Sequence, residues 1–282
     1  MRDQRDVMSK HHGKVAFIVK ILLWFYAACT MFVLVYMTYQ SLRPRRDVLS
    51  KTFGVPETLN LDNYIELFTE EHFLRYFGNS VLILVLSLVL LIALSSMTAY
   101  GIARYRFKGK SFCRAFFLLG MMFPAQLGVV PIFQIMKNLG LVNNQLSVVL
   151  VSAANISMPV FMLTNFFEGL PQEIYEAAVI DGAGEFTAFR KVMFPMATPV
   201  IFAVCITNSV TIWNQFFLPL IFLQTDSVKT IPQLISKYTS NIINSMDMAT
   251  ASSALSTIPI LILFFIFSNK ILDGVTAGAV KG

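Results

Sequence analysis

Small and acidic residues gather in one polar segment of the second half of the chain, where they could form contacts with another protein. Glu176 and Asp181 supply carboxylates that can pair with a basic partner. Ala177 and Ala178 are small enough to let another surface approach. Gly182 follows, and glycine readily takes the left-handed conformation that ends a helix. Two interpretations stay open from these residues alone, namely a helix that docks on a partner protein and an amphipathic helix that lies on a bilayer surface.

The residues around this segment predict two short helices. Pro171 suits the first turn of a helix that runs to about Asp181, with Glu173 near its positive end. A second helix is expected over Glu185–Phe194, and Pro195 then marks the entry into an apolar run. Apolar contacts are expected from residues that include Tyr175, Phe189 and Val192.

A second polar set recurs at helical spacing inside an apolar run and forms one stripe. Its members are Thr207, Asn208, Thr211, Asn214 and Gln215. Asn155 is a further polar residue in the preceding apolar run. Two interpretations stay open. The stripe could make interhelical hydrogen bonds, each stabilising by roughly 0.6 kcal/mol, or it could line a pathway for a hydroxyl-rich solute.

The sequence predicts neither a catalytic group nor a metal site. Its three cysteines form no CxxC or Cys/His pattern, so they are expected to be buried free thiols. Lys108–Ser111 ends like a phosphate-binding loop, but Arg104 occupies the place of the required first glycine. We therefore expect no cofactor in this chain.

Composition indicates an integral membrane protein. Hydrophobic residues make up 56% of the 282 residues and charged residues only 13%, against roughly 25% charged in soluble domains. A bilayer can solvate this much apolar surface. The net charge of +6 comes from basic residues between apolar runs, which fits membrane topology better than nucleic-acid binding.

Six apolar runs are long enough to cross a membrane as helices. They are Val15–Tyr39, Phe77–Tyr100, Phe112–Met136, Leu146–Phe167, Met196–Leu223 and Ala249–Leu272. The fold expected is therefore an all-α, polytopic transmembrane bundle. Several runs contain prolines that can kink their helices, namely Pro124, Pro131, Pro159, Pro219 and Pro259.

The distribution of Lys and Arg favours both termini on the cytoplasmic side. We expect a cytoplasmic tail over residues 1–14, a single membrane domain over 15–272, and a second cytoplasmic tail over 273–282. Residues 168–195, called the 168–195 loop from here on, then lie in the cytoplasm. The first outer loop is expected to include an amphipathic piece over Leu61–Phe77. The spans contain almost no charge, which argues against an ion-coupled carrier.

The 168–195 loop resembles the EAA loop of permeases in binding-protein-dependent ABC importers. Glu176-Ala-Ala is followed after three residues by Gly182, and Val192-Met-Phe-Pro195 ends the pattern. The family ends in Ile-x-Leu-Pro, so Val192 and Phe194 depart from it but stay apolar. Further matching stretches are Asn79-Ser80, Ala99-Tyr100, Arg104–Gly109, Leu139-Gly140-Leu141, Asp181-Gly182-Ala183, Trp213-Asn214 and Thr276–Gly282. The nearest type is the smaller permease of carbohydrate importers.

The resemblance implies a complex in the bacterial cell membrane. Two permeases form the pathway, two cytoplasmic subunits bind ATP and Mg²⁺, and an extracytoplasmic binding protein delivers sugar. Glu176 would pair with a basic ATPase residue, Ala177 and Ala178 would pack there, and Gly182 would set the turn. The tail residues Gly278, Lys281 and Gly282 would reach toward the ATPases, and the outer loop Gln224–Met248 would face the binding protein.

Two other functions remain open from the sequence. A permease of the same architecture could import a polyol or a glycerol phosphoester, although few Arg or Lys residues lie in the spans to attract an anion. A membrane enzyme or assembly factor is the other alternative, and it would need a reactive constellation at membrane depth, which is not visible.

Overall fold

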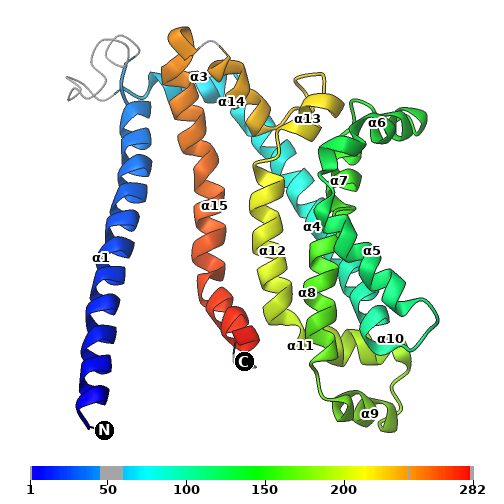
Figure 1. Cartoon of the computed structure of the whole chain (residues 1–282). Coiled ribbons are helices and arrows are strands. Elements are labelled where there is room, and N and C mark those ends of the chain that lie inside the picture. Colours follow the sequence, from blue (N-terminus) through cyan, green and yellow to red (C-terminus); the bar gives the residue numbers. More distant parts are fainter. Residues whose placement is uncertain (1, 45–59, 241, 280–282) are drawn as a thin grey trace. The chain divides into compact units, whose positions relative to one another are not determined.

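The computed structural model describes residues 2–44, 60–240 and 242–279, and every regular element in these ranges is a helix (Figure 1). The chain divides into two compact units. One combines residues 1–71 with 235–256, and the other combines residues 72–234 with 257–282. The predicted boundaries between the tails and the membrane domain stay predictions.

The first unit contains helix α1 (Arg2–Ser41), the short helix α3 (Asp62–Thr69), the end of α14 (Ile231–Thr239) and the start of α15 (Ile242–Ala279). Asn63 joins α3 to the end of α1, because its side-chain amide donates to the backbone oxygen of Ser41 over 3.1 Å. Many large apolar side chains of α1 are exposed, which suits a helix surrounded by lipid.

The predicted amphipathic piece over Leu61–Phe77 is shorter than expected. Helix α3 ends at Thr69, and α4 begins at Phe73. Between them His72 takes a left-handed conformation with a φ of 51°. This conformation interrupts the helical path, so the segment forms two helices instead of one.

The second unit is built around α4 (Phe73–Arg104), which packs against α7, α8 and α12 (Figure 1). Its other helices are α5 (Lys110–Met122), η1 (Ala125–Gly128), α6 (Val129–Asn138), α7 (Gln145–Ala153), α8 (Ser157–Glu168), α9 (Gln172–Ile180), α10 (Glu185–Ala188), α11 (Phe194–Met196), α12 (Thr198–Trp213) and α13 (Phe217–Phe222). Buried small residues on α4, including Ser87, Ser95 and Ala99, allow neighbouring backbones to approach closely.

The described residues contain three helices that are long and apolar enough to span a membrane, and up to six spans if each bent pair counts as one. The single helices are Ala16–Ser41, Phe73–Arg104 and Ser245–Ile266. The bent pairs are Lys110–Met122 with Gln126–Asn138, Gln145–Ala153 with Ser157–Glu168, and Glu185–Met196 with Thr198–Trp213. The orientation with both termini inside stays a prediction.

The run Met196–Leu223 is not one continuous helix. Helix α12 starts after a bend of 72° at Ala197 and ends at Trp213, and α13 begins only at Phe217. Prolines explain part of this pattern. Pro199 and Pro219 lie in the first turns of α12 and α13, as Pro159 does in α8, and at these positions the missing N–H would have no helical partner anyway.

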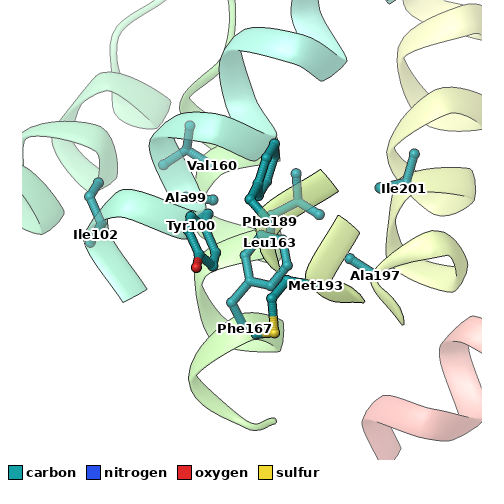
Figure 2. Packing of buried hydrophobic residues seen from close by; sticks show 10 residues of the cluster. All are labelled: Ala99, Tyr100, Ile102, Val160, Leu163, Phe167, Phe189, Met193, Ala197 and Ile201. Carbon is teal, nitrogen blue, oxygen red and sulfur yellow. The ribbon is translucent and has the colours of Figure 1, made fainter. Parts of the chain in front are cut away.

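A cluster of buried apolar residues lies at one end of α4 (Figure 2). Tyr100 of α4 is central to it, with ring centroids 5.0 Å from Phe189 and 5.8 Å from Phe167. The other members come from α4, α8, the π-helical turn η2 (Phe189–Met193) and α12: Ala99, Ile102, Val160, Leu163, Met193, Ala197 and Ile201. The cluster therefore joins η2, which belongs to the 168–195 loop, to α4, α8 and α12.

Candidate functional site

Helix α9 presents one exposed face, called the outer face of α9 from here on, outward from the 168–195 loop. Glu173, Glu176, Ala177 and Ile180 are all exposed and follow the spacing of one helical stripe. Ile180 is 85% exposed. Ala178, by contrast, is only 8% exposed and packs within this chain. Of the two alanines, Ala177 is therefore the one that a partner protein can reach.

Gly182 ends α9 in the way the sequence predicts. Its φ is +82°, and its N–H donates to the carbonyl of Val179 over 3.0 Å. The N–H of Ala183 donates to the carbonyl of Ala178, also over 3.0 Å. This pair of hydrogen bonds is a Schellman motif, which satisfies the last carbonyls of a helix and needs a left-handed residue. Asp181 precedes it, exposed, at the C-cap.

Four side chains, called the clasp, tie α9 and α10 to the end of α4. Glu185 of α10 accepts a hydrogen bond from the Tyr105 hydroxyl over 2.7 Å and a second one from the Tyr175 hydroxyl of α9. The guanidinium of Arg104 covers the ring of Tyr175. The clasp therefore connects three helices through one carboxylate, two phenols and one cation.

The protonation of the clasp favours these hydrogen bonds. Donation by Tyr175 and Tyr105 holds the pKa of Glu185 below its ordinary value. The hydrogen bond from Tyr105 to Glu185 is the main cause, and burial the second, of a pKa of Tyr105 that is raised to about 12. The hydrogen bond from Tyr175 to Glu185 likewise raises the pKa of Tyr175. At neutral pH the carboxylate is thus an acceptor and both phenols are donors.

The two ends of the 168–195 loop are also held in place. At its start Glu168 pairs with Arg114 over 3.0 Å and with Lys110 over 3.5 Å, which joins it to α5. Near its end Phe189 and Met193 are buried in the cluster of Figure 2, and Val192 packs against it. All three residues belong to η2, and π-helical turns occur frequently at functional sites. Pro195 follows, exposed, in α11.

The polar stripe lies on α12 and at its end. Thr207, Asn208, Thr211 and Asn214 each donate to the backbone carbonyl four residues earlier, and Gln215 accepts from the N–H of Phe217. Thr207, Thr211 and Asn214 are exposed along one side of the helix. Asn155 is exposed at the break between α7 and α8. The stripe thus faces away from the packed interior of the second unit.

Other polar residues hold the segment 223–231 at the opposite end of α4 from the cluster. The Asn79 amide donates to the carbonyls of Ser227 and Lys229 over 3.0 and 2.8 Å, and the Ser80 hydroxyl accepts from the N–H of Ile231. Asn143, with a φ of 60°, accepts from the N–H groups of Gln224 and Thr225. Asn79 and Ser80 belong to the stretches that match the family resemblance, but no sequence pattern assigns them a role.

Neither the clasp nor the contacts of Asn143 are predicted from the sequence. Tyr175 was expected to make apolar contacts and Glu185 only to begin a helix. Tyr105 and Glu185 are 80 positions apart, so no local spacing connects them. Of the tail residues, Gly278 lies in α15, whereas Lys281 and Gly282 lie outside the described residues.

Comparison with known proteins decides the family. Residues 90–277 match the family described as the binding-protein-dependent transport system inner membrane component. The chain belongs to this family. The match confirms the family that the resemblance indicates, and it makes the protein a multi-pass inner-membrane permease of a bacterial ABC importer rather than an enzyme.

Relatives of this permease match it over nearly its whole length. The diacetylchitobiose uptake system permease protein NgcG of Streptomyces coelicolor is 33% identical, with 93% of this chain and 87% of that protein covered. The arabinooligosaccharides transport system permease protein AraQ of Halalkalibacterium halodurans is 35% identical, with 92% and 94% covered. A bacterial ABC transporter involved in alginate import has a chain with a TM-score of 0.78 at 22% identity, covering 90% of this permease and 95% of that chain. This last match confirms the importer permease fold.

Proposed function

We propose that this permease forms, with a second permease, the membrane pathway of an importer for a sugar or oligosaccharide. An extracytoplasmic binding protein delivers the solute, and two cytoplasmic subunits that bind ATP and Mg²⁺ drive the transport. The proposed sugar class is supported by relatives that are named for diacetylchitobiose and for arabinooligosaccharides.

The single observation that carries the proposed mechanism is the attachment of α9 to α4. The outer face of α9, with Glu176, Ala177 and Ile180, is open to a partner. Its inner side is held to the end of α4 by the clasp. An ATPase that moves the outer face of α9 would therefore move α4, which runs through the second unit.

Charge and shape indicate how the ATPase would hold this face. The carboxylates of Glu173, Glu176 and Asp181 are exposed and would pair with basic residues of the partner. Ala177 permits close packing between them, and Ile180 offers an apolar side chain for a pocket. Gly182 sets the angle at which the chain leaves α9, and Val192 and Pro195 complete the loop. The tail with Gly278, Lys281 and Gly282 would add a second ATPase contact.

The polar stripe is proposed to line the solute path. Thr207, Thr211 and Asn214 face outward from the second unit, and a second permease placed along this side would enclose them. Their hydroxyl and amide groups can exchange hydrogen bonds with a sugar. Asn208, Gln215 and Asn155 would extend the same polar lining.

Reconstituted transport tests this function. The chain is co-purified with its partners, the complex is placed in vesicles with ATP, and uptake is measured for neutral oligosaccharides, polyols and glycerol phosphoesters. We expect ATP-dependent accumulation of an oligosaccharide that Asn214→Asp impairs, while the same change at the exposed Asn144, outside the stripe, leaves uptake intact. Uptake of a phosphoester alone would overturn the sugar assignment, and no ATP dependence would overturn the mechanism.

A further inference from the structure

A basic cavity lies where α4, α5 and the 168–195 loop meet. Its volume is about 290 Å³, which approaches the size of small-ligand sites. The residues that line it include Tyr100 and Arg104 of α4, Arg106 between α4 and α5, Lys110 of α5, and Glu168 and Gln172 of the 168–195 loop. None of these residues belongs to the outer face of α9 or to the polar stripe.

The charges of this cavity are unbalanced toward positive. Arg104, Arg106 and Lys110 line it, against the single carboxylate of Glu168. That carboxylate is already paired with Arg114 over 3.0 Å, outside the cavity wall, as well as with Lys110. The guanidinium of Arg104 also lies over the Tyr175 ring, and a guanidinium carries five N–H donors, more than one aromatic neighbour can occupy.

The lining residue Tyr100 carries a buried hydroxyl. Tyr100 is only 6% exposed, and within the described part of the chain its Oη has no hydrogen-bond partner. In the view of Figure 2 this oxygen lies at the end of the Tyr100 ring that points away from Val160. Buried polar groups are normally satisfied, so an unpaired one on a cavity wall points to a ligand oxygen.

We propose that this cavity binds the phosphate group of an anion, supplied by a phospholipid headgroup or by a small soluble phosphate ester. Phosphate oxygens accept several charge-assisted hydrogen bonds, and guanidinium groups match their geometry. The phosphate would accept from Arg104, Arg106 and Lys110, and the Tyr100 hydroxyl would donate to one of its oxygens. The occupant would lie beside the clasp, since Arg104 belongs to both.

Binding by the full-length chain in an uncharged detergent, at fixed ionic strength, tests this proposal without any transport assay. One arm measures retention of added phosphatidylglycerol by native mass spectrometry, and the other measures binding of glycerol 3-phosphate by calorimetry. Arg106→Gln is expected to weaken binding about tenfold, as the loss of one charge-assisted hydrogen bond. Tyr100→Phe, which keeps the ring, is expected to weaken it about threefold.

The matched control is Lys108→Gln. Lys108 is an exposed cation two positions from Arg106, and it does not line the cavity. Retention of the lipid alone would identify a headgroup as the ligand, and binding of glycerol 3-phosphate alone would identify a soluble ester. Both results support the site. Absence of binding in both arms, or equal losses in Arg106→Gln and Lys108→Gln, would overturn it.

Discussion

The guanidinium carbon of Arg104 lies 3.5 Å from the centre of the Tyr175 ring. This stacking joins the last residue of α4 to the middle of α9. Glu185 reinforces the same joint through its hydrogen bonds to Tyr105 and Tyr175. The 168–195 loop is thereby attached to the end of a helix of 32 residues.

Replacing Glu185 with Gln is expected to loosen α9. The neutral amide loses the charge that strengthens both tyrosine hydrogen bonds, so amides of residues 172–180 should exchange hydrogen about threefold to tenfold faster. Hydrogen–deuterium exchange of the full-length chain measures this. Asp181→Asn is the control, because it removes a carboxylate at the exposed C-cap, and its exchange should be unchanged or slower. Equal acceleration in both variants would contradict the clasp.

The ionisation of the clasp tyrosines should depend on Glu185. The pKa of Glu185 is lowered in the folded chain. Its ionisation therefore stabilises the fold above its ordinary pKa, and this stabilisation is lost as the pH falls through the lowered value. The pKa of Tyr105 is shifted in the other direction. The protonated phenol therefore stabilises the fold below pH 10.0, and this stabilisation is lost as the pH rises to about 12. In Glu185→Gln we expect more tyrosinate absorbance near 295 nm than in the wild type at pH about 11. Superimposable titrations would argue against the two hydrogen bonds.

Gly182 should be sensitive to any side chain, and Gly184 should not. No atom lies within 4 Å of a Cβ added at either position, so space does not distinguish them. Gly182 has a φ of +82° whereas Gly184 has a φ of −68°. Gly182→Ala is therefore expected to cost about 1 kcal/mol through backbone strain alone. Amide exchange at Gly182 and Ala183 should accelerate about fivefold, while Gly184→Ala leaves it unchanged; equal responses would refute the Schellman turn.

Asn143 is expected to anchor the segment 223–231. Its side-chain oxygen accepts from Gln224 and Thr225 over 3.0 Å each. Asn143→Ala removes these acceptors and places alanine at a φ of 60°, so limited proteolysis within the segment should speed up several-fold. Asn143→Asp keeps the acceptor oxygen and should stay close to the wild type. Proteolysis at the wild-type rate in Asn143→Ala would mean that other contacts hold the segment.

Local chemistry made some features predictable from the sequence, and tertiary packing decided the others. The end of α9 at Gly182 could be predicted because a glycine after a helix favours the left-handed conformation. The apolar run Phe77–Tyr100 predicts most of α4 from composition alone. The end of α12 at Trp213 lies beside a packing contact that no local pattern shows, because the rings of Trp213 and Phe77 meet edge to face with their centroids 5.9 Å apart. The clasp depends on residues 80 positions apart, so periodicity within one helix could not reveal it.

The most direct test of the account uses a photoreactive residue at position Ile180, in the complex of this chain with its partners. Ile180 is 85% exposed on the outer face of α9, and Leu119 of α5, 55% exposed, serves as the control position. Illumination should produce an adduct with the ATPase from position 180 and none from position 119. Adducts with lipid alone from position 180, in a complex that still transports, would mean that α9 lies on the bilayer and would contradict the account.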